Sequence, residues 1–80
     1  MLYEVKFKSV IARNVVKAFK EIHTRGVVHG DVRVENILVR KDNSVIVVDF
    51  ESSEMNADES ALDAEQEEVR SLLEWWKHQQ

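Results

Sequence analysis

The sequence predicts a small α+β fold in the order helix, polar loop, β-hairpin, helix. Two stretches carry apolar residues at the spacing of amphipathic helices, and two short β-branched runs separated by a polar turn lie between them. The chain has 80 residues, of which 44% are hydrophobic and 32% charged, enough for one modest core. We therefore expect a single domain over residues 1–80. Its free energy of unfolding should be small, so we expect a partner chain to help stabilise it.

The first predicted helix covers residues 9–25. Its apolar positions are Ile11, Val15, Ala18, Phe19 and Ile22. Ser9 is a suitable N-cap, because its hydroxyl can accept a hydrogen bond from a free backbone N–H of the first turn. Gly26 is expected to end the helix, since glycine readily adopts the left-handed conformation that often follows the last turn.

The predicted hairpin joins residues 37–40 to residues 45–48 through the polar turn at residues 41–44. The second run, Val45 to Val48, has no polar alternation. A strand of this kind is usually covered on both faces, so we expect a helix against one of them.

A second helix is predicted from about Ser60 to Trp76. Ser60 followed by Asp63 resembles a capping box, and the apolar residues Leu62, Val69, Leu72, Leu73 and Trp76 repeat at helical spacing. Adjacent helical positions diverge by about 100°, so one of Trp75 and Trp76 is expected to be buried and the other exposed.

Charge is distributed unevenly, with a balance of +3 over residues 1–50 and −7 over residues 51–80. The acidic segment either pairs with the basic one or is solvated. The basic residues form no dense cluster with aromatic residues, so we expect no nucleic-acid partner. The lack of cysteine excludes disulfides and thiolate metal sites. We expect a cytoplasmic, or else nuclear, protein, because no apolar run approaches a membrane span and residues 1–8 lack a signal-peptide core.

The polar segment HGDVRVEN, residues 29–36, carries the candidate chemistry. If the two strands pair, Asn36 at the start of the first lies beside Asp49 at the end of the second. One carboxylate and one amide oxygen form half of a shell for Mg²⁺, leaving room for nucleotide phosphates. Asp31 faces the same space and is placed to accept a hydroxyl proton, and Arg33 can offset phosphate charge.

These residues resemble two motifs of the protein-kinase superfamily. The segment HGDVRVEN is similar to the catalytic loop, and Asp49-Phe50-Glu51 to the metal-binding Asp-Phe-Gly signature. The resemblance covers about residues 9–51, because a helix also precedes the loop in that family. It implies a partial kinase C-lobe with its catalytic core in residues 9–51 and an acidic C-terminal helix in residues 52–80.

The resemblance also implies roles for single residues. Asp31 matches the catalytic base, and Arg33 takes the place of a lysine that contacts the transferred phosphate. Asn36 and Asp49 match the ligands of Mg²⁺ and, through it, of ATP. His29 matches a histidine that links the loop to the second motif.

The sequence also departs from the family pattern. Gly30 replaces the arginine that senses a phosphorylated activation loop, Glu51 replaces the signature glycine, and Phe50 is expected in the core. Both motifs are similar to those of kinase-like proteins of fungi and of the choline-kinase and aminoglycoside-phosphotransferase group. The N-lobe is absent from residues 1–80, because Gly26 and Gly30 are the only glycines and neither belongs to a glycine-rich loop.

Several functions follow from this resemblance. The first is ATP- and Mg²⁺-dependent phosphoryl transfer to a protein Ser or Thr hydroxyl. We expect this activity to be weak or lost in the isolated chain. An N-lobe, either on another chain or in a longer form of this chain, would complete the site. The others are phosphorylation of a small molecule, a non-catalytic kinase-derived binding module, and a relic that folds poorly. His23 and His78 are expected to be ordinary packing or surface residues.

Overall fold

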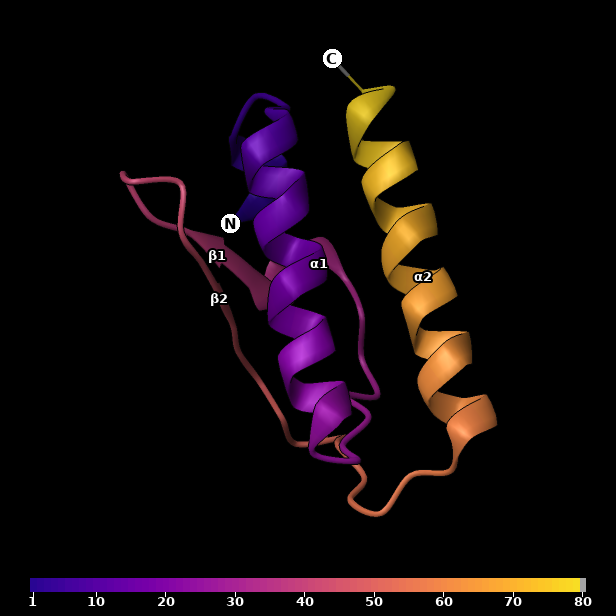
Figure 1. Cartoon of the computed structure of the whole chain (residues 1–80). Coiled ribbons are helices and arrows are strands. Elements are labelled where there is room, and N and C mark those ends of the chain that lie inside the picture. Colours follow the sequence, from indigo (N-terminus) through magenta and orange to yellow (C-terminus); the bar gives the residue numbers. More distant parts are fainter. Residues whose placement is uncertain (80) are drawn as a thin grey trace.

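A computed structural model of the chain describes residues 1–79 and shows two antiparallel helices side by side, with a β-hairpin against the first (Figure 1). This arrangement confirms the predicted α+β class and the order helix, loop, hairpin, helix. The elements are the 3₁₀ turn η1 (Leu2–Glu4), helix α1 (Ser9–Thr24), the 3₁₀ turn η2 (Val34–Asn36), strands β1 (Ile37–Val39) and β2 (Val45–Val47), and helix α2 (Glu59–Lys77).

Helix α1 begins one residue earlier than its predicted cap allows. Ser9 is the first helical residue and Lys8 is the N-cap, with no side-chain cap hydrogen bond. The prediction of Ser9 as N-cap is therefore wrong, because the change from extended to helical backbone occurs at Lys8. Gly26 does follow the helix with a left-handed φ of 74°, and its N–H donates to the carbonyl of His23 at 2.9 Å.

The hairpin has the predicted antiparallel register, with Ile37 opposite Val47. Asn14 of α1 donates from Nδ2 to the carbonyl of Asn43 in the turn at 2.9 Å, which fastens the hairpin to the helix. Helix α1 packs on β2 as expected. The three residues of β2 are nevertheless only half-buried, so the prediction that both faces are covered is wrong. In this two-stranded sheet β2 is an edge strand, which leaves it partly open to solvent.

Helix α2 is capped by Asp58, whose carboxylate accepts the N–H of Ala61 at 2.9 Å. The predicted capping box of Ser60 and Asp63 is wrong, because Ser60 already lies inside the helix and donates its hydroxyl to Asp58. Asp58 precedes the helix in an extended conformation, which is the geometry an N-cap needs.

The two tryptophans diverge as predicted. Trp76 is 1% exposed and donates its indole N–H to the carbonyl of Val5 at 3.0 Å, whereas Trp75 is 49% exposed. Trp76 thereby joins the end of α2 to the start of the chain. The core lies between the helices and under β1, and it consists of Leu2, Ile11, Val15, Phe19, Ile37, Val69, Leu73 and Trp76.

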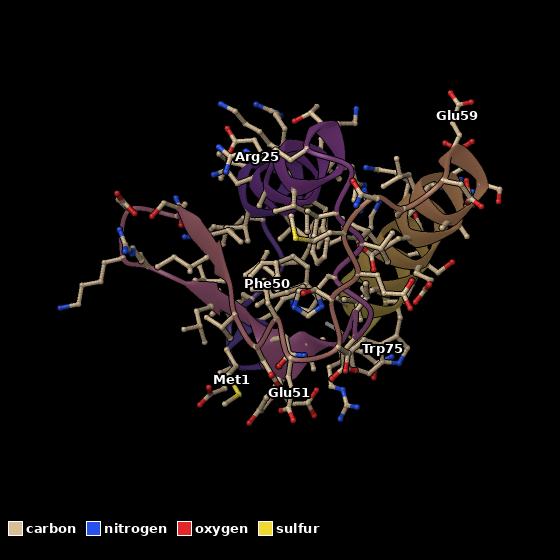
Figure 2. All side chains as sticks on the ribbon, turned by 90° about the horizontal axis from the view of Figure 1, so that it is seen from below. Met1, Arg25, Phe50, Glu51, Glu59 and Trp75 are labelled. Carbon is tan, nitrogen blue, oxygen red and sulfur yellow. The ribbon has the colours of Figure 1, made fainter. Side chains whose placement is uncertain are left out.

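Apart from Glu65, which is buried and bound to His23, the acidic segment is not paired with the basic one. Within residues 1–79, no Lys or Arg of the first fifty residues forms an ion pair with an Asp or Glu beyond them. Arg25, which follows α1, and Glu59, the first residue of α2, project outward at separate places in the view along the helices (Figure 2). Neither helix in the described part of the chain is long and apolar enough to cross a membrane.

Candidate active site

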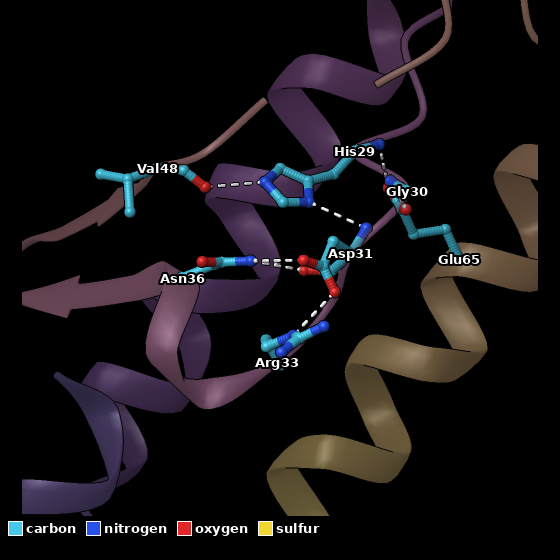
Figure 3. Close-up of polar contacts among 7 residues, drawn as sticks. All are labelled: His29, Gly30, Asp31, Arg33, Asn36, Val48 and Glu65. Atoms are coloured by element: carbon cyan, nitrogen blue, oxygen red, sulfur yellow. Dashed lines mark hydrogen bonds and ion pairs between the residues drawn. The ribbon is translucent and has the colours of Figure 1, made fainter. Parts of the chain in front are cut away.

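The candidate loop is organised around the buried imidazole of His29. Its Nδ1 accepts the backbone N–H of Asp31 at 3.2 Å, so the ring proton lies on Nε2, which donates to the carbonyl of Val48 at 2.8 Å (Figure 3). Val48 immediately precedes Asp49. The link between the loop and the second motif that was expected of His29 is therefore present as a direct hydrogen bond.

Phe50 packs differently from the expectation. Its ring meets His29 edge to face with centroids 4.7 Å apart, yet the side chain is 40% exposed. The prediction that Phe50 lies in the core is wrong, because His29 itself fills the space beneath it and contacts the core residue Phe19. Phe50 covers the histidine from the solvent side.

Asp31 is held by two neighbours within its own loop. Arg33 donates from Nε to one carboxylate oxygen at 2.8 Å, and Asn36 donates from Nδ2 to the other at 3.3 Å and to the Asp31 carbonyl at 2.9 Å (Figure 3). The hydrogen bond from Arg33 is the main cause that lowers the pKa of Asp31 below its ordinary value. Asp31 is thus an ionised acceptor with a defined orientation.

Asn36 and Asp49 are brought together through the backbone of the hairpin. The N–H of Val48 donates to the carbonyl of Asn36 at 2.9 Å, which places Asp49 one residue beyond the partner of Asn36. Asp49 has a left-handed φ of 62°, an uncommon conformation that Asp tolerates better than most residues. Among residues 1–79, no hydrogen bond joins the Asp49 side chain to the other three candidate residues.

The donor groups present fit a hard divalent cation. Asn36 turns its amide nitrogen toward Asp31, so its amide oxygen points away from Asp31 (Figure 3). That oxygen and the carboxylate of Asp49 are the kinds of ligand that Mg²⁺ accepts, with water and phosphate oxygens completing the shell. In the described part of the chain, no group of three or more His, Asp and Glu residues could hold a metal ion alone.

Gly30 lets the loop approach the segment that follows Phe50. Its φ is 88°, and a Cβ atom at this position would lie 2.3 Å from the carbonyl oxygen of Ser52. Only glycine avoids both the backbone strain and this overlap. The replacement of the usual arginine by Gly30 therefore coincides with a close backbone contact.

The loop is anchored from outside by Glu65 of α2, a residue that the sequence analysis missed. Its carboxylate accepts the N–H of His29 at 2.8 Å and that of Gly30 at 2.9 Å, although its side chain is 2% exposed (Figure 3). Burial acts to raise the pKa of Glu65, but the hydrogen bonds together outweigh it and the pKa is lowered. A buried carboxylate thus fixes the backbone just before Asp31.

His23 completes this anchor. It is buried, accepts from Nε2 of Gln66 at 2.6 Å, and donates from its own Nε2 to Glu65 at 2.7 Å. His23 is a packing residue as expected, but its hydrogen bond to Glu65 gives it a part in the anchor that was not foreseen. His78 is an exposed residue near Glu74, as expected. A signal for both anchors existed, because His23 and Glu65 stand on the apolar faces of their helices, where a polar residue needs a partner.

Several known proteins with similar sequences are named as kinases. The family described as protein kinase domain matches residues 2–72. The chain is similar to the serine/threonine-protein kinase VPS15 of Saccharomyces cerevisiae, with 47% identity over 47 residues, or 59% of this chain and 3% of that protein. It is also similar to the protein kinase YegI of Escherichia coli K12, with 35% identity over 51 residues, or 64% of this chain and 8% of that protein.

A third relative is the probable SapB synthase of Streptomyces coelicolor, with 49% identity over 39 residues, or 49% of this chain and 4% of that protein. No solved structure matches the chain. The chain belongs to the protein kinase domain family, because the family match covers most of its length. It spans less than a tenth of the length of these relatives. Members of this family use ATP and divalent metal ions.

Proposed function

We propose that this chain is the part of a protein-kinase-like C-lobe that carries the catalytic loop, and that it serves ATP- and Mg²⁺-dependent phosphoryl transfer to a protein Ser or Thr hydroxyl. Residues 1–80 form one partial domain, with the catalytic core in residues 9–51 and the acidic helical segment in residues 52–80. The observation that carries this proposal is the grouping of Asp31, Arg33 and Asn36 beside the backbone of Asp49.

Asp31 orients the acceptor hydroxyl. Its lowered pKa keeps the carboxylate ionised at neutral pH, so it accepts the hydroxyl hydrogen and directs the oxygen lone pair at the phosphorus. The contact to Asn36 limits its rotation. The proton leaves the hydroxyl as the phosphoryl group is transferred, and Asp31 takes it.

Arg33 has two partners in this scheme. It is bound to Asp31 in the free chain, and its side chain is 60% exposed, so the pair can separate readily when an anionic group arrives. Moving to the γ-phosphoryl group would both stabilise its charge and release a carboxylate oxygen for the hydroxyl. Binding of the nucleotide would thereby free the Asp31 carboxylate to act as the catalytic base.

Asn36 and Asp49 are the residues that would hold Mg²⁺. The metal ion supplies charge neutralisation and alignment of the ATP phosphates when bound. The hydrogen bonds that the Asn36 amide nitrogen donates to Asp31 orient its side chain, and the N–H of Val48 fixes its backbone carbonyl. The chain's own contribution would thus be the oriented side chain of Asn36 and the carboxylate of Asp49, which follows the backbone partner of Asn36.

The nucleotide clamp must come from elsewhere, because residues 1–80 contain no glycine-rich loop. An N-lobe from a longer chain or from a partner would supply it. We therefore propose that the isolated chain binds Mg²⁺-ATP weakly and transfers phosphate poorly or not at all. A cytoplasmic location, with the nucleus as the alternative, is part of the same proposal.

Amide NMR of the 80-residue chain titrated with Mg²⁺, ATP and both together tests the site. We expect joint shifts at Asp31, Asn36 and Asp49 only when both are present. Asp49→Ala should abolish this response, whereas Asp31→Asn should keep it and remove any transfer measured with an added N-lobe. Asp42→Asn, in the hairpin turn, is the matched control and should respond like the unmodified chain. Unchanged binding in Asp49→Ala would exclude the assignment.

A non-catalytic binding module is the second candidate. The half-exposed rings of Trp75 and Phe50 favour it, because large exposed aromatic side chains are common in interfaces. Binding of Mg²⁺-ATP with no transfer in the presence of an N-lobe would support this function. Transfer to choline or an aminoglycoside, but not to a Ser or Thr peptide, would instead identify a small-molecule phosphotransferase.

A further inference from the structure

Strand β2 has one edge that pairs with no other strand of residues 1–79. Its other edge pairs with β1, and the sheet in this part of the chain has two strands. The hairpin lies on the side of α1 away from α2 (Figure 1). An unpaired strand edge presents a row of backbone N–H and C=O groups, so another strand can pair with it.

The register of the hairpin shows which backbone groups point outward along this edge. The N–H of Val48 donates to the carbonyl of Asn36 at 2.9 Å, which makes these residues a hydrogen-bonded pair. Hydrogen-bonded and non-hydrogen-bonded pairs alternate along an antiparallel ladder. Val45 and Val47 therefore belong to non-hydrogen-bonded pairs and direct their N–H and C=O groups away from β1. Within residues 1–79, no hydrogen bond reaches these groups.

The strand lacks the features that usually protect an exposed edge. Natural sheets place charged residues, proline or a bulge there, whereas residues 45–48 are Val-Ile-Val-Val. Val45 and Val47 pack against the core. Ile46 points to the opposite face, because side chains alternate along a strand, and it is half-buried beside Leu38 of β1. The open edge is therefore combined with an apolar outer face.

A second copy of β2 fits this edge by symmetry. With a two-fold axis at Ile46, Val45 lies opposite the partner's Val47, and Val47 lies opposite the partner's Val45. These are the residues whose backbone groups point outward, so each pair can exchange both of its hydrogen bonds. Ile46 then meets the partner's Ile46 in a non-hydrogen-bonded pair, where the side chains of opposite residues are closest.

Charge favours the antiparallel arrangement. Exposed cations precede β2 at Arg40 and Lys41, and exposed carboxylates follow it at Asp49 and Glu51. Asp42 also lies at the start of β2, but there its single carboxylate faces two cations. A two-fold axis brings the basic start of one strand near the acidic end of the other, which favours association. A parallel arrangement would place like charges together.

The space beside the edge admits the second strand. A groove of about 220 Å³ lies between α1 and the start of β2, and its lining consists of Asn14, Lys17, Ala18, Glu21, Ser44 and Val45. Opposite residues of an antiparallel pair carry their side chains on the same face. The partner's Val47 would therefore lie next to Val45 and enter this groove beside Ala18.

We propose that two copies of this chain associate through the free edges of β2, so that their hairpins form one antiparallel sheet across a two-fold axis at Ile46. This interface is independent of the proposed function, because the pairing needs neither nucleotide nor metal.

The first test is sedimentation equilibrium of the 80-residue chain without nucleotide, over a roughly hundredfold range of protein concentration. We expect a reversible equilibrium between monomer and dimer. Ile46→Lys should raise the Kd of the dimer about tenfold or more, since it places like charges opposite each other at the axis. Trp75→Lys replaces a half-exposed apolar residue near the end of α2 and is the matched control. It should dimerise like the unmodified chain, and circular dichroism should show that both variants keep their helices.

Amide hydrogen exchange of the unmodified chain locates the interface without any substitution. The N–H groups of Val45 and Val47 should become more protected as the protein concentration rises. The N–H of Ile46 should be protected at every concentration, because Ile46 is already paired with Leu38 within the hairpin.

A chain that stays monomeric over the whole range would overturn the proposal. So would a dimer in which exchange at Val45 and Val47 does not depend on concentration, or one that Trp75→Lys dissociates and Ile46→Lys does not. Association that continues beyond the dimer would also overturn it, because a two-fold interface closes on itself.

Discussion

Replacing Glu65 with glutamine should destabilise the fold far more than its conservative size suggests. The carboxylate accepts hydrogen bonds from His29, Gly30 and His23 at distances of 2.7 to 2.9 Å. A glutamine offers one acceptor oxygen in place of two, and its NH₂ group would face a backbone N–H. At least one buried donor then loses its partner, at a cost of about 1–3 kcal/mol.

The remaining hydrogen bonds also lose their charge assistance, which brings the expected loss to about 2–4 kcal/mol. Domains of this kind have total stabilities of roughly 0.05–0.15 kcal/mol per residue, or about 4–12 kcal/mol for this length. The substitution should therefore remove a large part of the stability. Glu68→Gln, one turn further along α2 and exposed, is the control and should change the unfolding free energy by less than about 0.5 kcal/mol.

The assay is urea unfolding followed by tryptophan fluorescence and far-ultraviolet circular dichroism, because Trp76 is buried in the core. Amide hydrogen exchange adds a local readout. Glu65→Gln should speed exchange at His29 and Gly30 more than at the core of α1. Unfolding free energies of Glu65→Gln and Glu68→Gln that agree within about 0.5 kcal/mol would refute the reasoning.

Three further predictions follow from the same contacts. Gly30→Ala should destabilise the chain by more than Gly26→Ala. Both residues have positive φ, and the left-handed backbone strain of an alanine is about 1–2 kcal/mol, but only at position 30 would the Cβ lie 2.3 Å from the carbonyl oxygen of Ser52. The urea midpoints of the two variants test this order. The free energy of unfolding should fall as the pH drops through and below 4.5, the ordinary pKa of a glutamate. The reason is that folding lowers the pKa of Glu65, so that unfolding takes up a proton in this range. In urea unfolding curves measured at a series of pH values, Glu65→Gln should show a smaller fall. Trp76→Ala should cost about 3–5 kcal/mol in urea unfolding followed by circular dichroism alone, since it leaves a cavity in the core and removes the donor to the carbonyl of Val5. A cost below about 1 kcal/mol would contradict that role.

The regular elements were predictable because local periodicity carries the information. The apolar spacing in α1 and α2 fixed both helices to within one or two residues. The caps were less predictable, since the choice between Ser60 and Asp58 depends on where the backbone becomes extended rather than on residue type. The half-exposure of β2 was also not predicted, because the local sequence pattern does not indicate that the sheet has only two strands.

In the candidate site too, the contacts within the loop were predictable from the sequence and the long-range contact was not. Asp31, Arg33 and Asn36 lie within one short loop, so their contacts follow from spacing and turn geometry. The proximity of Asn36 to Asp49 followed from one assumption, that the hairpin pairs. Glu65 lies more than thirty residues beyond the amides that it binds, and no local pattern specifies such a contact. Its place on an apolar helix face showed only that it needed a partner.

The anchoring of the loop explains why the two motifs are not sufficient to define the geometry of the candidate site. Gln66 donates to His23, His23 donates to Glu65, and Glu65 receives the amides of His29 and Gly30. No buried side-chain polar atom among residues 1–79 lacks a hydrogen-bond partner, so this cluster is fully satisfied and resists rearrangement.

The position of Asp31 is therefore determined by both helices as well as by the contacts within its own loop. A fragment that ended after Glu51 would keep every motif residue but lose α2 and with it the acceptor for two loop amides. The loop would then exchange among conformations, and the ionised Asp31 would no longer face a defined direction. The acidic helix, which carries neither of the two motifs, is the element that supplies the acceptor for the loop amides.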